Sequence, residues 1–123
     1  MPPASAPLPV VLHVPHASVE IPADVRQTLT ISDKELEREL LRMTDRYTDE
    51  LFAVPGATSV LFPVSRLVVD PERFPEDADE PMSRGGMGAV YTRTSDGDAL
   101  RGDLTVEERA ALLERFYHPH HAR

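Results

Sequence analysis

The sequence contains no cysteine, and this absence excludes a disulfide framework and a thiolate metal site. No apolar run is long enough to span a bilayer. The net charge of −8 argues against nucleic acid as a partner, because phosphate binding needs a cationic surface. The first seven residues lack the basic charge and the hydrophobic segment of a secretory signal. We therefore expect a cytoplasmic protein with no nucleic-acid or membrane partner, although local arginines are still compatible with a small anionic substrate.

Glycine is also scarce, since six glycines stand against twelve prolines. Most of the prolines fall at the apparent ends of elements, which indicates stiff connections and shaped loops. The length of 123 residues, with 41% hydrophobic and 28% charged residues, is typical of one soluble globular domain. We expect residues 1–7 to be a disordered lead and residues 8–123 to form that domain.

Several stretches have the composition of strands. Residues 9–14 are apolar apart from His13, which is typical of a central strand in a parallel or mixed sheet. That strand must end at Pro15, so His16 lies in the turn beyond it. The other strand-like stretches are residues 57–64, 65–70 and 89–94, and the acidic, proline-rich and glycine-rich segment 72–88 predicts a long loop.

Two capping boxes, Ser32–Glu35 and Thr105–Glu108, predict the starts of two helices. The first helix is predicted to run to about Phe52 and the second to about Tyr117, and we expect Pro119 to end helical structure there. The order of strands and helices indicates an α/β domain. In an α/β chain a helix is usually followed by a further strand, and none follows the last predicted helix. We therefore expect an incomplete chain.

Two aspartates fall on the first predicted helix. At about 100° per residue, Asp45 lies at the edge of the broad apolar face, whereas Asp49 lies further round among arginines. We therefore predict that Asp45 is semi-buried and that Asp49 is solvated.

His16 is the first candidate site residue. A histidine just past the carboxyl end of a buried strand occupies the position where open α/β sheets place their sites. Neutral imidazole is a common metal ligand, and hydrolytic zinc sites combine histidines with a carboxylate. The alternative is a histidine that is hydrogen-bonded in a turn. His13 comes three residues earlier in an extended segment, so we expect it on the opposite face of the sheet, with a structural role.

The second candidate is the segment in which Arg66 and Arg73 bracket Asp70 near a strand end. The planar fork of arginine suits a carboxylate that is held bidentately, which points to binding of an anionic substrate. The alternative is an ion pair between Asp70 and one arginine that stiffens the turn at Pro71.

Other patterns are less informative. His118, His120 and His121 form a terminal histidine cluster, but the expected helix end at Pro119 removes the scaffold that would align them as ligands. The loop from Ser83 to Gly88 lacks the Gly-Lys-Ser/Thr of a phosphate loop. No Gly-x-Ser-x-Gly elbow or thiol nucleophile is present, so metal-activated water is the hydrolytic mechanism best suited to the residues present.

The blocks VLHVPHASVEIP, MTDRYTDELF, FPVSRLVVDPERFPED, MGAVYTRTSDGDALR and FYHPHH together resemble the N-formylglutamate amidohydrolase family. The resemblance covers nearly the whole chain, and SRLVVDPERF and PHAS are its most specific parts. It implies hydrolysis of N-formylglutamate to glutamate and formate, in histidine degradation, or action on a related N-acyl amino acid. It also implies a mixed sheet flanked by helices, similar to zinc-dependent exopeptidases and succinylglutamate desuccinylases.

The resemblance also implies roles for particular residues. His16 matches the first ligand of Zn²⁺ or another divalent metal, and Asp45 matches the carboxylate ligand, with Asp49 as the fallback. Arg66 and Arg73 match the arginines that clamp substrate carboxylates, and we group Asp70, which they bracket, with them as substrate-binding. His121 matches a histidine near the substrate, which we expect to be catalytic.

The sequence departs from the family pattern at three places. Glu72 stands where many relatives have asparagine, and His120 replaces a tyrosine. The family continues into a strand with an Asp-x-His-Ser block, whose histidine is the expected next metal ligand, whereas this sequence ends at Arg123. We therefore expect either an N-terminal fragment or a degenerate relative.

Three functional hypotheses follow. The first is a metal-dependent hydrolase of N-formylglutamate. The second is a catalytically incomplete relative or fragment that binds small carboxylates or a partner chain. The third is a deacylase for another N-acyl amino acid, because two arginines do not distinguish glutamate from other carboxylates. The sequence does not predict the oligomeric state.

Overall fold

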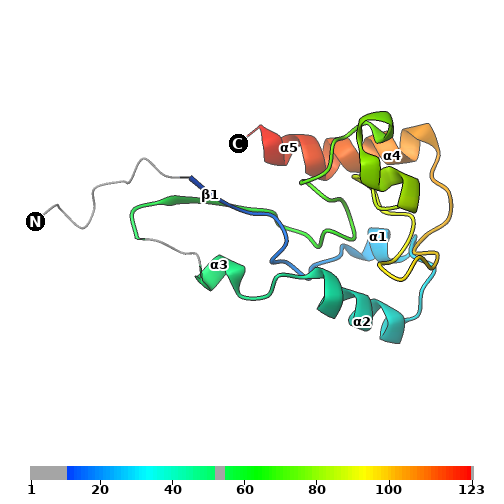
Figure 1. Cartoon of the computed structure of the whole chain (residues 1–123), viewed down its shortest axis with the longest axis horizontal. Helices are drawn as coiled ribbons and strands as arrows, with labels where there is room; N and C mark the ends of the chain where they lie inside the picture. The colour runs from blue at the N-terminus through cyan, green and yellow to red at the C-terminus, as the bar shows by residue number, and fades with distance from the viewer. Residues whose placement is uncertain (1–10, 52–54, 123) are drawn as a thin grey trace, which may run out of the picture.

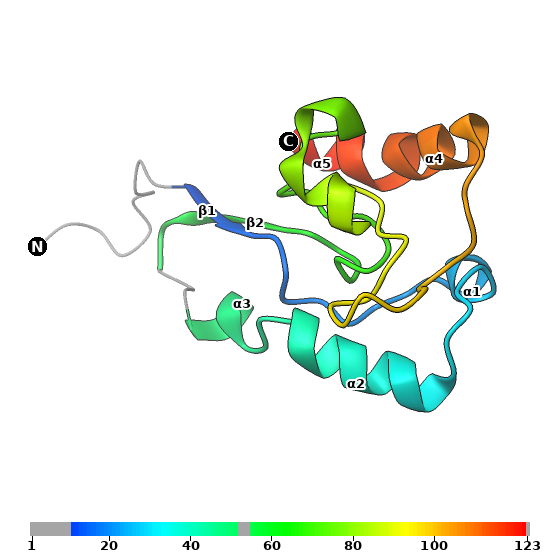
Figure 2. The ribbon, with the colours of Figure 1, turned by 45° about the vertical axis from the view of Figure 1, so that its right-hand side comes forward.

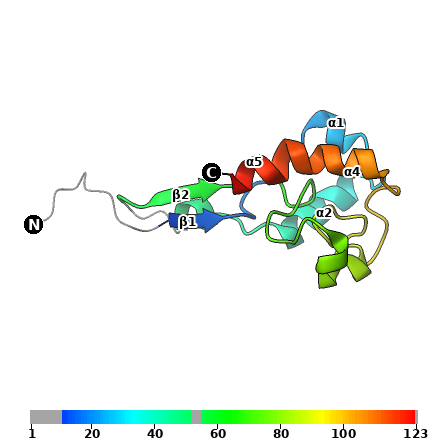
Figure 3. The same cartoon turned by 90° about the horizontal axis from the view of Figure 1, so that it is seen from above.

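The computed structural model describes residues 11–51 and 55–122, so the expected disordered lead lies outside the described residues. Strand β1 (Val11–Val14) pairs in parallel with strand β2 (Thr58–Leu61), in a register that places Val11 opposite Thr58 and Val14 opposite Leu61. Figures 1 and 3 show this two-stranded ribbon extending to one side of the helices. It is the one sheet in the described part of the chain. The predicted α/β class is confirmed in this coarse sense.

Helices make up most of the remaining regular structure. The capping boxes at Ser32 and Thr105 are both present, as predicted. None of the described helices is long and apolar enough to cross a membrane. The helices are α1 (Ala23–Arg26), α2 (Asp33–Met43), α3 (Thr48–Leu51), the 3₁₀ turns η1 (Asp77–Asp79) and η2 (Pro81–Gly85), α4 (Val106–Leu112), the π-helical turn η3 (Leu113–Tyr117) and α5 (His118–His121).

The core lies between α2 on one side and the α4–α5 rod on the other, as Figure 2 shows. Leu113 and Tyr117 of the rod belong to one buried cluster, which also contains Val68. Leu36 of α2 belongs to a second cluster, which contains Leu67. Because neighbouring residues of one segment enter both clusters, the segment around Leu67 and Val68 is buried from both sides.

The predicted strands at 65–70 and 89–94 are not strands. The first segment turns at once, since the Val68 N–H donates to the Ser65 carbonyl (2.9 Å). One backbone bond joins the two segments, from the Asp70 N–H to the Ala89 carbonyl (2.7 Å). Their apolar residues are buried, and burial alone does not distinguish a strand from an irregular core segment.

The helix predicted from Ser32 to Phe52 is interrupted, and Phe52 itself lies outside the described residues. Helix α2 ends at Met43, and the backbone N–H of Asp45, beyond the extended Thr44, donates to the His16 carbonyl (2.8 Å). Helix α3 starts only after Tyr47, which has a φ of +66°. A tertiary hydrogen bond to the segment after β1 therefore overrides the helical propensity of the sequence.

The C-terminal helix does not end at Pro119, contrary to the sequence-based expectation. Helix α4, the π-turn η3 and α5 follow without a gap from Val106 to His121. Pro119 is the second residue of α5 within this continuous helical run, so the helix lacks one backbone hydrogen bond there. The wider π-turn directly before it changes the hydrogen-bond pattern of the helix at that point. The histidines around Pro119 are therefore held on a helix.

Tyr47 provides a test of the strained break between α2 and α3. A left-handed backbone costs an ordinary residue about 1 kcal/mol, whereas asparagine adopts it more readily and a β-branched residue less readily. Because the Tyr47 ring is exposed, its replacement loses little packing. We expect Tyr47→Asn to raise the free energy of unfolding by about 0.5 kcal/mol and Tyr47→Val to lower it by about 1 kcal/mol. Urea denaturation measures both, and equal stabilities would contradict the strained turn.

Candidate functional site

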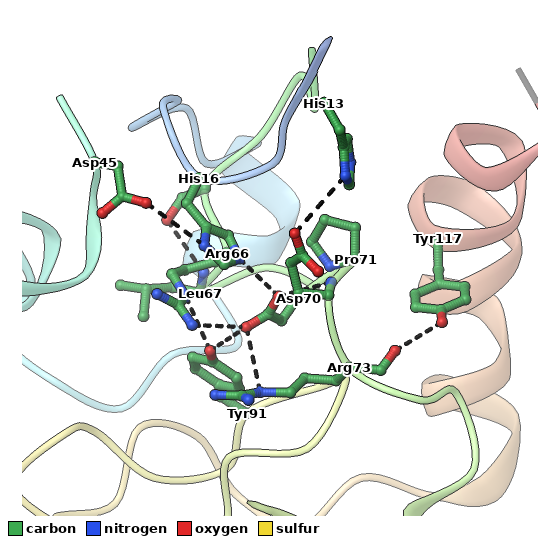
Figure 4. Close-up of polar contacts among 12 residues, drawn as sticks. His13, His16, Asp45, Arg66, Leu67, Asp70, Pro71, Arg73, Tyr91 and Tyr117 are labelled. Atoms are coloured by element: carbon green, nitrogen blue, oxygen red, sulfur yellow. Dashed lines mark hydrogen bonds and ion pairs between the residues drawn. The ribbon is translucent and has the colours of Figure 1, made fainter. Parts of the chain in front are cut away.

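His16 lies just beyond the end of β1, between Asp45 and Asp70 in the polar cluster of Figure 4. Its Nε2–H donates to Oδ1 of Asp70 (2.8 Å). Its Nδ1 faces the Asp45 carboxylate, with 3.8 Å between Nδ1 and Oδ2. In a neutral imidazole a protonated Nε2 leaves a lone pair on Nδ1, so the atom that faces Asp45 is available to a cation or a proton.

Asp70 is the buried centre of this cluster, and its side chain has 0% exposure. Besides His16, its carboxylate accepts hydrogen bonds from Arg66 (3.0 Å), from the Tyr91 hydroxyl and from the backbone N–H of Glu72 (3.0 Å). Burial alone would raise the pKa of Asp70, but the hydrogen bonds from His16 and Tyr91 and the charge of Arg66 outweigh it and hold the pKa well below its ordinary value. Asp70 is therefore a carboxylate in the folded protein.

Both arginines that bracket Asp70 contact it. Besides its bond to Asp70, Arg66 donates through Nε to the Tyr91 hydroxyl (3.0 Å), and Nε of Arg73 lies 3.5 Å from Oδ2 of Asp70. Their side chains are 16% and 22% exposed. The ion pair that was the alternative to substrate binding is thus present, and both arginine side chains remain partly exposed.

The aspartates at 45 and 49 are in different places. The Asp45 side chain is 61% exposed, so the prediction that it is semi-buried is wrong, because the helix that would have packed it ends at Met43. It nevertheless faces His16. Asp49 is exposed as predicted and lines a different hollow, together with Val14. The structure thus brings Asp45 to His16, and it does not bring Asp49 there.

A cavity of about 280 Å³ lies in front of His16. His13 also lines it, as does its strand neighbour Val14, so the lining does not decide on which face of β1 the His13 side chain lies. The prediction that His13 and His16 lie on opposite faces stays a prediction. The cavity is lined by His13, Val14, Pro15, His16, Asp45, Thr48 and Glu72.

His121 does not line this cavity. Its Nε2–H donates to the carbonyl of Pro71 (2.7 Å), and Tyr117 on the same rod donates to the carbonyl of Arg73 (2.7 Å). The C-terminal rod therefore holds the backbone on both sides of Glu72. In this conformation His121 acts on the loop that carries the site rather than on the cavity itself.

Comparison with known proteins identifies the family of this chain. A family model described as N-formylglutamate amidohydrolase matches residues 8–123. The chain belongs to the N-formylglutamate amidohydrolase family. The solved N-formylglutamate amidohydrolase of Ralstonia eutropha JMP134 is similar in structure, with a TM-score of 0.80 and 26% sequence identity over 95% of this chain. The match covers 46% of that protein, so this chain spans about half its length. A comparison with curated proteins found no match.

The described residues of this family member do not form a complete metal centre. No group of three or more His, Asp or Glu side chains in the described ranges is placed to hold a metal ion. His16 and Asp45 supply two donors, and the hydrogen bond from His16 to Asp70 is the outer-shell arrangement common for metal-bound histidines. Catalytic zinc usually takes three protein ligands. An imidazole and a carboxylate are both groups that bind zinc, but two ligands are fewer than the three of a usual catalytic site.

Sequence reasoning missed several residues that shape the site. Tyr91 lies in a segment with the composition of a buried strand. Its side-chain hydroxyl was the signal that could have indicated a role in the site, because a buried tyrosine hydroxyl needs a hydrogen-bond partner. Burial and the Asp70 charge raise the pKa of Tyr91, so it remains a hydrogen-bond donor. Arg101 is buried and donates to the Leu67 carbonyl, and burial lowers its pKa to about 10. Neither spacing nor composition indicated these contacts.

Asp70→Asn tests the role of the buried carboxylate. We expect the free energy of unfolding to fall by about 3 kcal/mol near neutral pH, because Arg66 loses its buried partner. The folded-state pKa of Asp70 lies below its unfolded value of about 3.9, so this stabilisation is complete above that pH and is lost as the pH falls through the folded-state pKa. Urea denaturation of both proteins at decreasing pH should therefore show their stabilities converging.

The matched control is Asp103→Asn, which removes the same charge from an exposed position. We expect it to leave the free energy of unfolding within about 0.5 kcal/mol of the parent protein. A difference between Asp70→Asn and the parent that does not shrink in acid would show that packing, and not the carboxylate charge, is what the substitution disturbs.

Proposed function

We propose that this chain forms part of the active site of an amidohydrolase that cleaves the amide bond of an N-acyl amino acid. N-formylglutamate is the first candidate substrate, and the products would be formate and glutamate. The observation that carries the proposal is the His16 imidazole, held through Nε2 by the buried Asp70, with Nδ1 directed at Asp45 beside a cavity. Family membership supports the reaction class.

Arg66 and Arg73 are proposed to bind a carboxylate of the substrate. Both side chains stay partly exposed while they contact Asp70, and a guanidinium can donate to an anion bidentately. Asp70 itself has no exposed surface, so we now propose a positioning role for it in place of direct substrate contact. It orients the His16 ring and fixes both guanidinium groups, which is how a site keeps its reacting groups in place before the substrate arrives.

A divalent metal, with zinc the first candidate, is proposed to bind His16 Nδ1 and the Asp45 carboxylate. A metal bound there would lower the pKa of a coordinated water molecule and polarise the acyl carbonyl. At least one further ligand has to come from outside the described residues, because those residues supply two. Asp49 is not placed to replace Asp45.

His121 is proposed to position the Pro71 carbonyl, and through it the segment that carries Asp70 and Glu72, rather than to act on the substrate. The likeness to zinc-dependent exopeptidases, the role in histidine degradation and the cytoplasmic location are part of the same proposal. They rest on the family to which the chain belongs.

The second candidate function is binding of a small carboxylate without turnover. One observation favours it: the described residues offer no group of three or more metal donors. In that case Arg66 and Arg73 would still hold the ligand. The two functions differ in whether the protein releases formate from N-formylglutamate when zinc is supplied.

Calorimetric titration with Zn²⁺ tests the proposed ligands. We expect weak binding, because two protein donors bind zinc far less tightly than a complete set. His16→Ala should abolish this binding, Asp45→Asn should weaken it, and Asp49→Asn should leave it unchanged. Tight stoichiometric binding by the parent chain would contradict the incomplete donor set, and a His16→Ala protein that still binds zinc normally would contradict the ligand assignment.

Formate release from N-formylglutamate by the zinc-loaded chain decides between the two functions. Turnover that disappears in His16→Ala supports the amidohydrolase. Absence of turnover, together with binding of N-formylglutamate that is lost when Arg66 is changed to Met, supports the carboxylate-binding alternative.

A further inference from the structure

We propose that Glu72 determines specificity by excluding a second carboxylate from the cavity in front of His16. Within the proposed reaction class, the preferred ligand would then be an N-acyl amino acid with one carboxylate and a neutral or cationic side chain, and N-formylglutamate would be a weaker ligand than N-formylglutamine. This inference rests on the proposed function, because it concerns which N-acyl amino acid the same site accepts.

The side chains that line the cavity carry negative charge. Asp45 and Glu72 both present carboxylates to it, with side chains that are 61% and 50% exposed. No lysine or arginine is among its described lining residues. A divalent metal between His16 and Asp45 would offset one part of this negative charge, but Glu72 would still line the cavity with its own carboxylate. An anionic group that enters beside Glu72 therefore meets repulsion.

The two arginines lie elsewhere. Figure 4 shows Arg73 and Tyr91 on the side of Asp70 away from His13. Arg66 and Arg73 both contact Oδ2 of Asp70, so their positive charge is concentrated at this one place. The site thus offers one region for a carboxylate and a separate, acidic region beside His13 and Glu72.

His13 lies beside Glu72. The distance between His13 Nδ1 and Glu72 Oε1 is 3.7 Å, which is too long for a hydrogen bond. The other ring nitrogen, Nε2, is hydrogen-bonded to Nε2 of His120 (2.7 Å), so the ring is held on that side. The contact with Glu72 is therefore an ion pair only when the His13 ring is protonated.

Glu72 is also held where it acts. Its backbone N–H donates to Oδ1 of Asp70 (3.0 Å), and the preceding carbonyl, that of Pro71, accepts from His121. The main chain that carries the Glu72 side chain is therefore fixed. A carboxylate carried by such a backbone at a cavity wall discriminates against anions by repulsion, which is a common way for a site to reject one of two similar ligands.

The test compares N-formylglutamine with N-formylglutamate. The two ligands have nearly the same shape and differ by one negative charge, so the ratio of their dissociation constants isolates the electrostatic effect. We would titrate the 123-residue chain with each ligand, without added metal, and follow backbone amide signals by NMR. We expect the parent chain to bind N-formylglutamine about fivefold more tightly at low salt, with a smaller ratio at high salt.

Glu72→Gln should bring this ratio close to one by improving the binding of N-formylglutamate. Glu76→Gln is the matched control, because it removes the same charge from an exposed glutamate of the same loop that does not line the cavity. We expect it to leave the ratio unchanged.

The outcomes separate the two proposals. If both ligands bind but the ratio is the same in the parent chain and in Glu72→Gln, the role of Glu72 is wrong while the proposed function stands. A parent chain that prefers N-formylglutamate would equally overturn the role of Glu72 and leave the proposed function intact. If neither ligand binds, the proposed function fails, and the inference about Glu72 fails with it.

Discussion

The buried carboxylate of Asp70 is the interaction on which the rest of the site depends. It accepts hydrogen bonds from His16, Arg66 and Tyr91 and from the backbone of Glu72, so the end of β1, the loop after β2 and the segment at Tyr91 meet at one side chain. A buried charge is costly to leave unpaired, so these partners are under strong constraint. Because Nε2 of His16 donates a hydrogen bond to Asp70, Nδ1 is the ring nitrogen that remains available to a cation or a proton.

Two further constraints place the groups around that centre. The backbone hydrogen bond from Asp45 to the His16 carbonyl ends the helical path after Met43 and brings an exposed carboxylate beside the imidazole. On the other side, Tyr117 and His121 bond to carbonyls of the loop that carries Glu72. The cavity is therefore bounded by segments that are each tied by hydrogen bonds, which is the condition for a site that keeps its geometry in the absence of ligand.

Features that depend on local sequence were predicted well. The capping boxes at Ser32 and Thr105 use residues three apart, and both helices begin there. The end of β1 before Pro15 follows from the chemistry of proline, and it places His16 where a site was expected. The motif around Asp70 also indicated the ion pair with Arg66, and the family resemblance is confirmed.

Features that depend on contacts between distant segments were not predictable in the same way. Periodicity extended the helix from Ser32 through Asp45, but a bond to His16, from a different part of the chain, ended it earlier. Strand alternation predicted opposite faces for His13 and His16, and it did not indicate the cavity that both residues line. The sequence by itself determined where the helices start, where β1 ends and which residues carry the chemistry. Only the tertiary structure decided which of these residues meet, because the partners of the buried Asp70 come from segments that no local pattern connects.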